Sequence, residues 1–271
     1  MTGLNDHKIS AVERVAIIEE SNKFITQHLA SRRIAGFSSA QLPVDKDELN
    51  AAIMGAGIAG FHESMSKRSK RIVKNTYMYA DLFALLKYPS PRDKQKRYAE
   101  FMRIMKIAGW FAFNEPYNRY KATSQKLSMD NVALGIIHTA IGTAVSNGAA
   151  AAKVLSSVAD ATMEALKNEP EALKLFEDNS KKADGGNFCM SSSMQGKDDD
   201  ITMAIAAVQY FAHAQPTKVL FVDWSTSSIE IYNGAATMHM DEEDYLAVEP
   251  KIEKILSEHR QRALTYEFGK A

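Results

Sequence analysis

Apolar side chains recur every three or four residues along much of this chain, which is the spacing of one face of an α-helix. Two of these stretches open with a capping box, Ser10 with Glu13 and Asp45 with Glu48. Ser90-Pro91 marks a third start, with a capping hydroxyl before a proline at the first helical position. We therefore expect helices over residues 10–29, 45–58, 90–108, 132–166, 201–213 and 241–264.

The C-terminal part of the chain carries strand patterns instead. Residues 218–224 are a short apolar run, which is typical of a buried strand. Asn233-Gly234 is a dipeptide that two-residue hairpin turns favour, and it separates 228–232 from 235–240. The pattern predicts that 219–224 pairs with the 228–240 hairpin in one antiparallel sheet. The predicted fold class is therefore α+β, mostly helical, with a small antiparallel sheet.

A weak internal correspondence bears on the architecture. A shift of 152 residues lays Phe37–Phe61 on Cys189–His213 without a gap and matches serine, acidic and apolar positions. Each copy would then contain a short strand, an acidic helix cap and an apolar helix. The correspondence predicts two similarly built halves, 10–125 and 128–268, within a single compact domain over 1–271.

Composition narrows the function classes. Lys and Arg number 33, Asp and Glu number 33, and the pI is near 7.1, so nucleic-acid binding by bulk charge is not expected. The single cysteine cannot form an internal disulfide. Residues 1–6 lack the basic-then-apolar order of a secretory signal. The apolar segment 132–155 includes polar residues such as Lys153, so we expect a buried central helix there and a chain that is soluble when made.

Gly55–Gly60 has the spacing of a dinucleotide-binding fingerprint, with Asp81 near the position of a ribose-binding acid. That fingerprint requires a preceding strand, whereas 45–54 is capped and charged like a helix. We therefore predict that Gly55–Gly60 lies inside a helix and contacts no nucleotide. The seven histidines are scattered without the spacing of metal ligands, so no metal site is expected.

The only cysteine, Cys189, follows Gly185-Gly186 and precedes the hydroxyl run Ser191–Ser193. We expect it in a short strand or loop, between a flexible glycine turn and the next helix. Three uses of the thiol are open. It can lie inert in a core, as free cysteines commonly do, or carry a thioester-linked acyl chain. It can also act as a nucleophile, with a histidine such as His138 or His213 as its base.

Two basic clusters favour contact with a membrane surface. The first occupies 67–74 and the second 92–106, and an aromatic stretch over 110–120 follows the second. Taken singly, each cluster is typical of a solvated helix face, and the aromatic stretch is typical of a packed core. Together with an acylated thiol they would supply the two signals that stable anchoring requires, because a single acyl chain gives only marginal binding.

A chain of this size with an α+β layout, two weakly similar halves and one cysteine after Gly185-Gly186 resembles the Erwinia virulence factor (Evf) family. Members of that family are bacterial proteins implicated in persistence in the insect gut, with a fold of two intertwined α/β halves. A cysteine in their second half carries a palmitoyl thioester. The resemblance implies that Cys189 carries covalently bound palmitate. It also implies a protein of the bacterial cytoplasm, released without a Sec signal, that associates with membranes when acylated and acts on a host target.

We expect the palmitoyl tail to lie in an apolar groove within the protein, because burying it would contribute about 10 kcal/mol. Gly185 and Gly186 would give an acyl donor access to the thiol. The helix over 132–155, with Gly135 and Gly142, would form one wall, and the helix over 201–212 another. Methionines would adapt to the chain, namely Met190, Met194 and Met203.

The main functional prediction is thus a membrane-associated virulence factor that is S-acylated on its only cysteine. Two alternatives remain open. One is an acyl-transfer or thioester-hydrolysing enzyme with a cysteine nucleophile, and the other is a helical interaction protein with an inert cysteine.

Overall fold

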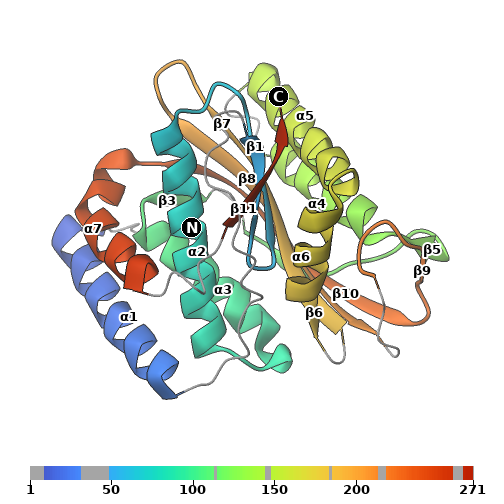
Figure 1. The fold of residues 1–271 in the computed structure, drawn as a ribbon, viewed down its shortest axis with the longest axis horizontal. Helices are drawn as coiled ribbons and strands as arrows, with labels where there is room; N and C mark the ends of the chain where they lie inside the picture. Colours follow the sequence, from blue (N-terminus) through green and yellow to red (C-terminus); the bar gives the residue numbers. More distant parts are fainter. Residues whose placement is uncertain are drawn as a thin grey trace, which may run out of the picture.

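The computed structural model describes residues 9–31, 49–112, 115–143, 148–182, 185–212, 218–258 and 265–270 of the 271-residue chain. Its helices flank a central sheet (Figure 1). The described helices are α1 (Ala11–Ser31), α2 (Lys67–Lys87), the 3-10 helix η1 (Pro91–Asp93), α3 (Lys94–Ile107), α4 (Met129–Thr143), α5 (Gly148–Lys167), α6 (Pro170–Ser180) and α7 (Glu242–Glu258).

The central sheet has the strand order β11-β1-β2-β7-β8-β10-β3, with β4 and β6 pairing beside this path with β10 and β7. Its strands are β1 (Leu49–Met54), β2 (Gly57–Phe61), β3 (Trp110–Ala112), β4 (Tyr117–Arg119), β6 (Lys181–Lys182), β7 (Gly185–Gln195), β8 (Ile201–Ala212), β10 (Ile229–Met240) and β11 (Thr265–Lys270). β5 (Lys126–Leu127) and β9 (Trp224–Ser225) form a separate small sheet. Among the described strands, β2 and β7 pair in parallel and the other pairs are antiparallel.

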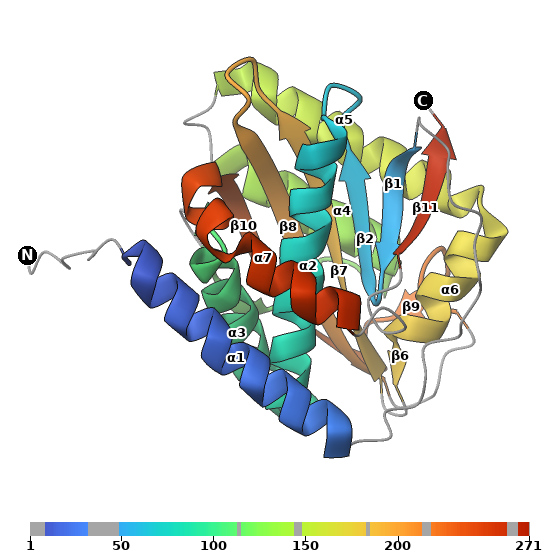
Figure 2. The ribbon, with the colours of Figure 1, turned by 60° about the vertical axis from the view of Figure 1, so that its left-hand side comes forward.

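Two helical layers cover the two faces of the sheet (Figures 1 and 2). Helices α1, α2, α3 and α7 cover one face, and a core cluster that includes Tyr79, Ile104 and Met203 fills the space between. Helices α4, α5 and α6 cover the other face over a second cluster, which includes Phe176 and Met190. The central strands are therefore buried on both faces, and alternate side chains of one strand belong to different cores.

The α+β fold class is confirmed, and the sheet is larger than expected and contains one parallel pair. Strands from the two predicted halves alternate in the sheet. β1 and β2 lie between β11 and β7, while β3 and β4 lie beyond β10. The existence of a repeat, and of a single domain over 1–271, stays a prediction.

Helices with local start signals are found where they were expected. Ser10 and Glu13 form the predicted capping box, in which the Ser10 N–H donates to Glu13 Oε2 at 2.9 Å. The Ser90 hydroxyl accepts the Arg92 N–H at 3.2 Å before η1 and α3. α7 begins after Asp241, whose carboxylate accepts the Asp244 N–H at 3.1 Å. The long helix predicted over 132–166 appears as α4 and α5, with residues 144–147 outside the described ranges.

The helix predicted over 45–58 is wrong where the structure describes it. Leu49–Met54 and Gly57–Phe61 are antiparallel strands joined by a two-residue turn, and Gly55 supplies the φ of 59° that this turn requires. The segment 49–61 contains no charged residue, which suits strands covered on both faces. Gly55–Gly60 therefore belongs to a hairpin and not to a helix. The short strand expected in the first copy of the internal correspondence, at residues 33–39 in the chain, lies outside the described residues.

The helix predicted over 201–213 is also wrong, because Ile201–Ala212 is the central strand β8. A strand buried on both faces is apolar at consecutive positions, so its pattern does not distinguish it from a buried helix. Asp198–Asp200 does not cap a helix. It lies in the turn between β7 and β8, where Asp199 adopts a φ of 63°.

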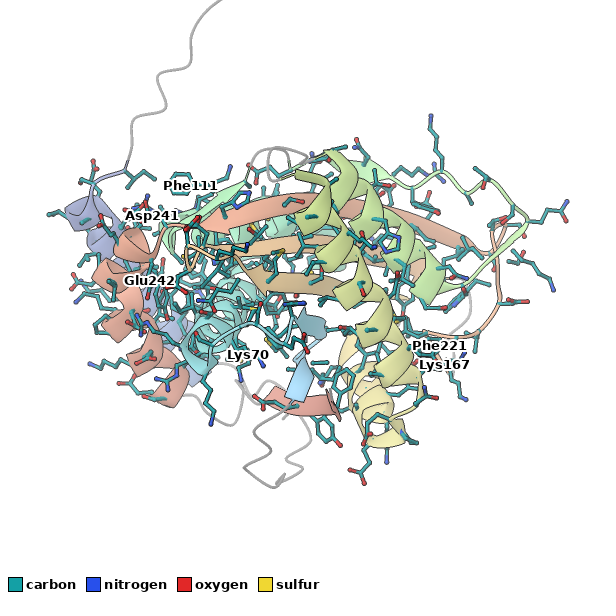
Figure 3. The ribbon with its side chains drawn as sticks, turned by 90° about the horizontal axis from the view of Figure 1, so that it is seen from above. Lys70, Phe111, Lys167, Phe221, Asp241 and Glu242 are labelled. Atoms are coloured by element: carbon teal, nitrogen blue, oxygen red, sulfur yellow. The ribbon has the colours of Figure 1, made fainter. Side chains whose placement is uncertain are left out.

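Two strand predictions in the C-terminal part are wrong as well. Asn233-Gly234 lies inside the continuous strand β10, where Gly234 makes room for the Tyr98 ring instead of forming a turn. Residues 219–223 are not a strand and do not pair with β10, and only Trp224–Ser225 forms a strand, with β5. The main-chain N–H groups of this segment donate to carboxylates: Val219 and Leu220 to Glu177, and Phe221 (labelled in Figure 3) to Asp130.

Candidate functional site

Cys189 lies in the middle of the sheet, on strand β7. It pairs with Gly57 of β2 on one side and with Ala207 of β8 on the other. Its side chain packs against the core between the sheet and α2–α3, and the residue keeps partial exposure. Of the two expectations, a short strand or a loop, the structure has a strand, which is longer than expected and is followed by strand β8 instead of a helix.

Small residues surround Cys189 on this face of the sheet. One cross-strand row runs through Gly57, Cys189, Ala207 and Gly234, and the next row runs through Ala59, Ser191, Ile205 and Ala236. Because neighbouring strands lie about 4.8 Å apart, the first row extends about 14 Å across the sheet. We call the small members of these rows the small-residue floor: Gly57, Ala59, Cys189, Ser191, Ala207, Gly234 and Ala236.

Two buried tyrosines cover the ends of the first row. A Cβ at Gly57 would lie 2.5 Å from the hydroxyl oxygen of Tyr77, a residue of α2. A Cβ at Gly234 would clash with the ring of Tyr98, a residue of α3. Glycine inside a strand is destabilising unless another group must approach the backbone closely, so these two glycines are explained by the tyrosine rings above them.

The thiol of Cys189 is held in its neutral form. Burial, followed by the nearby Asp81 carboxylate, raises the pKa of the thiol from its ordinary value of 9.0 to about 12. A hydrogen bond from the Tyr77 hydroxyl and the charge of Arg97 act in the opposite direction and lower that pKa. At pH 7 only about one thiol in 10⁵ is then ionised, so this cysteine is a poor nucleophile in the folded protein.

Polar side chains line the floor toward one end of β7. Arg97 Nη2 lies 3.3 Å from Asp81 Oδ1, and Arg97 Nη1 donates to Asn187 Oδ1 at 3.4 Å. The side chains of Arg97 and Asp81 are 20% and 30% exposed, so this ion pair lies where solvent reaches the edge of the floor. The thiol therefore has an apolar floor on one side and a partly hydrated ion pair on the other.

Three hydroxyls on this side of the sheet are buried without a described hydrogen-bond partner. They belong to Ser191 of the floor, to Ser193 beside it and to Tyr98. Ser191 and Ser193 are almost fully buried and alternate with Ser192, so they face the same side as Cys189. A buried hydroxyl without a partner is costly, and such groups are rare in folded proteins. The Ser192 hydroxyl, which faces the other helical layer, has no described partner either, so the unpartnered hydroxyls belong to this part of β7 and not to one face of the sheet.

Of the groove residues predicted from the sequence, only Met203 lies in the same core as Cys189. Met190 belongs to the core on the opposite face, because adjacent residues of a strand point to opposite sides. Gly135 and Gly142 are exposed on α4, and a Cβ at either would touch nothing within 4 Å. The structure thus does not bring the glycines of α4 to the thiol.

Gly185 and Gly186 begin strand β7 and do not form a flexible turn. Gly185 has a φ of 140°, and a Cβ there would clash with the main chain of Tyr210. A Cβ at Gly186 would clash with the Ser180 carbonyl oxygen at the end of α6. Close main-chain packing, not access to the thiol, accounts for this pair of glycines.

Of the two candidate bases, the structure describes His138, and it does not lie beside the thiol. His138 lies on α4, in the other helical layer, with its Nε2 3.1 Å from Asp160 Oδ1 of α5. His213 lies outside the described residues. Reasoning from the sequence did not identify Tyr77 and Tyr98 as part of the site. Gly57 and Gly234, which are glycines within apolar segments, were the signal that a large side chain approaches the sheet there.

The basic clusters largely pair with acidic side chains of the protein itself. On α2, which carries Lys70 in Figure 3, Arg68 Nε lies 2.8 Å from Glu242 Oε1 of α7. On α3, Arg103 Nη2 lies 2.6 Å from Glu100 Oε1. Further pairs are Arg68 with Glu249, Arg71 with Glu253, Lys74 with Glu267, Lys96 with Asp93, Arg97 with Asp81 and Lys106 with Glu115. These pairs reduce the positive potential that the clusters would offer to a membrane.

The described residues contain neither a metal-binding cluster nor a membrane-spanning helix. No three His, Cys, Asp or Glu side chains in the described ranges gather where they would hold a metal ion. Of the helices within those ranges, none has the length and apolar character that crossing a membrane demands.

No protein-family model and no curated protein matches the chain. Solved structures do match. A δ-endotoxin aligns over 74% of this chain and 88% of its own, with 15% identity and a TM-score of 0.39. The activated Cyt2Ba monomer from Bacillus thuringiensis subsp. israelensis aligns over 53% of this chain and 79% of its own, with 15% identity and a TM-score of 0.34.

The Evf virulence factor is also among the matched structures. It aligns over 93% of this chain and 91% of its own, with 12% identity and a TM-score of 0.32. The similarity to Evf that the sequence suggested is therefore found among solved structures. By their names, the matched proteins include a toxin and a virulence factor.

Proposed function

We propose that this protein carries a fatty acyl chain in thioester linkage to Cys189 and that the chain lies between the small-residue floor and α2–α3. The observation that supports this proposal is the position of the thiol on a floor of small residues, whose ends are covered by the rings of Tyr77 and Tyr98. The role in virulence that the sequence resemblance implies, with its unknown host target, stays part of the proposal.

The dimensions of the floor suit such a chain. A palmitoyl tail is about 20 Å long, and at about 0.8 kcal/mol per buried methylene its burial would contribute on the order of 10 kcal/mol. Cys189 is the second member of the row, so a chain that starts there can follow the floor over two strand spacings to Gly234, which accounts for about 10 Å of that length. The remainder would extend toward the ion pair of Asp81 and Arg97, where the floor meets solvent.

The tyrosines would have to turn to admit the chain. Tyr98 can do so at little cost in hydrogen bonds, because its hydroxyl is buried and has no described partner. Tyr77 would exchange its hydrogen bond with the thiol for one with the thioester carbonyl, since a hydroxyl can donate to either.

Membrane association would follow from release of the chain rather than from the basic clusters, most of whose members are paired within the protein. In the folded protein the chain would be kept out of water. At a bilayer, the acyl tail would move from the floor into lipid, which offers it the same apolar surroundings. One chain alone gives only reversible membrane binding, so the proposed attachment is reversible.

A second candidate is an inert core cysteine in a non-enzymatic interaction protein, which the raised thiol pKa and the hydrogen bond to Tyr77 favour. The third, a cysteine enzyme, requires a thiol ionised near neutral pH, which this environment opposes.

Intact mass spectrometry of protein purified from its native bacterial host tests the proposal. We expect a mass increment of acyl size that hydroxylamine removes after denaturation and that Cys189→Ser abolishes. Ser192→Ala is the matched control, because Ser192 lies on the same strand and faces the opposite helical layer. Acylated wild type should also float with liposomes more than Cys189→Ser. An unmodified mass for the wild type would leave the inert cysteine as the correct account.

A further inference from the structure

A pocket of about 640 Å³ lies at the end of the sheet where β10 begins, and its lining residue Phe211 is four residues along β8 from Ala207, the partner of Cys189. Its described lining comes from three separate parts of the chain. Arg119 belongs to β4, Phe211 to β8, and Thr226, Ser227, Ile229 and Glu230 to the turn before β10 and its first residues. Pockets of this volume commonly hold small organic ligands.

The lining residues offer hydrogen-bond donors and acceptors and carry one positive and one negative side chain, and the Lys94 ammonium lies beside the Phe211 ring. Arg119 Nη2 lies 2.8 Å from Glu230 Oε1, and these side chains are 62% and 46% exposed. The guanidinium presents several N–H donors and the carboxylate several acceptor sites, so both keep capacity for a ligand. Arg119 would attract an anion and Glu230 would repel it. A cation would be attracted by Glu230 and repelled by Arg119.

Phe211 is a fixed aromatic surface in this pocket. The Lys94 ammonium lies 4.3 Å from the centre of its ring, and the Tyr232 ring meets it edge-on with the centres 6.4 Å apart. An aromatic ring held by neighbours loses little conformational freedom when a ligand packs on it.

The hydroxyl groups of the turn are also fixed. Ser227 Oγ lies 2.8 Å from Ser225 Oγ, and Thr226 Oγ1 donates to the Gln125 carbonyl oxygen at 3.1 Å. The Thr226 N–H donates to the same oxygen at 3.0 Å, which ties the turn to the segment before β5. Each hydroxyl retains acceptor capacity toward the pocket.

We propose that this pocket binds a neutral carbohydrate of one or two sugar units. A pyranose has an apolar C–H face, which packs on an aromatic ring, and hydroxyls that both donate and accept. Phe211 would take the apolar face, and Arg119 with Glu230 would bind adjacent hydroxyls. This inference is independent of the acyl chain at Cys189.

Saturation-transfer NMR with the purified full chain tests the proposal, using glucose, galactose, mannose, N-acetylglucosamine and their disaccharides as probes. We expect at least one sugar to give saturable binding. Phe211→Ala and Glu230→Gln should each weaken it about tenfold, which corresponds to about 1.4 kcal/mol. Glu230→Gln keeps the size of the side chain, so it remains informative if Phe211→Ala fails to fold.

Phe111→Ala is the matched control. Phe111 is 45% exposed on β3, which pairs with the opposite end of β10 near Asp241 (Figure 3), so its loss should leave sugar binding unchanged. The proposal is overturned if no sugar binds saturably, or if both pocket variants bind like the wild type. It is also overturned if inorganic phosphate binds the pocket in place of sugars, because the site would then recognise charge.

Discussion

The free thiol of Cys189 should be unusually slow to alkylate in the folded protein. Its pKa is raised from 9.0 to about 12. Only the thiolate reacts with iodoacetamide, and at pH 8 its fraction falls from about 0.1 to about 10⁻⁴ with this change in pKa. We therefore expect protein whose acyl group has been removed to react about 1,000-fold more slowly when folded than when unfolded in guanidinium chloride.

The pH dependence separates ionisation from simple lack of access. In the unfolded chain the rate should level off above pH 9, where the thiol is already ionised. In the folded protein it should keep rising about tenfold per pH unit toward pH 12, because each unit increases the thiolate fraction tenfold. A thiol that is only sterically shielded would instead react slowly but level off near pH 9 in both states.

Two variants should shift the rate in opposite directions. Asp81→Asn removes a negative charge that raises the thiol pKa, so alkylation at pH 8 should become faster. Tyr77→Phe removes the hydroxyl that lowers the pKa by hydrogen bonding, so alkylation should become slower. The measurement is the rate of carbamidomethyl mass gain over time. Folded and unfolded rates within tenfold of each other, or equal shifts in both variants, would refute this account of the site.

Three further predictions concern the same region and the fold. If the acyl chain is present, native protein should resist hydroxylamine and lose its acyl mass only after denaturation, because the floor excludes water and nucleophiles from the thioester; equal loss in both states would contradict burial. Gly234→Val should destabilise the protein by about 2 kcal/mol or more in urea unfolding, because the valine side chain would meet the Tyr98 ring. Gly142→Val is the control at an exposed helix position and should destabilise the protein by under about 1 kcal/mol. Above pH 9 the free energy of unfolding of the wild type should fall by up to about 1.4 kcal/mol per pH unit more than that of Cys189→Ser, because the unfolded state ionises Cys189 first and the folded state resists ionisation until about pH 12. Buried tyrosines whose pKa is also raised, such as Tyr77 and Tyr98, add the same loss to both proteins, and equal slopes in the two proteins would show that the thiol is hydrated.

Local signals in the sequence were sufficient for the helices that begin with a cap. The capping box of Ser10 and Glu13 and the Ser90-Pro91 pair act within one helical turn, so no knowledge of distant segments is needed to interpret them. The apolar strands were mistaken for helices because burial on both faces removes the alternation that identifies a strand. Ile201–Ala212 forms the strand β8 and not a helix because it pairs with β7 on one side and β10 on the other. That pairing depends on the whole fold and not on the local sequence.

The candidate site was predictable only in part. The residues around Cys189 predicted a short strand or a loop, and the structure has a strand there. The floor did not, because its members come from β2, β7, β8 and β10, and its cover comes from α2 and α3. Met190 was placed on the wrong side because the register of β7 decides which residues face which core. Gly57 and Gly234, which are glycines within apolar runs, were the available signal for Tyr77 and Tyr98.

The order of strands in the sheet has a consequence for how the chain is made. β7 inserts beside β2, and β11, the last described strand, completes the edge next to β1. Contacts between segments so far apart form late, and a chain growing on the ribosome cannot complete this sheet until nearly all of it has emerged. Newly synthesised Cys189 therefore spends an interval in a nascent chain whose β8 and β10 do not yet exist. During that interval the thiol has its ordinary acidity and is open to an acylating enzyme, so the timing of synthesis provides the access that the finished fold denies.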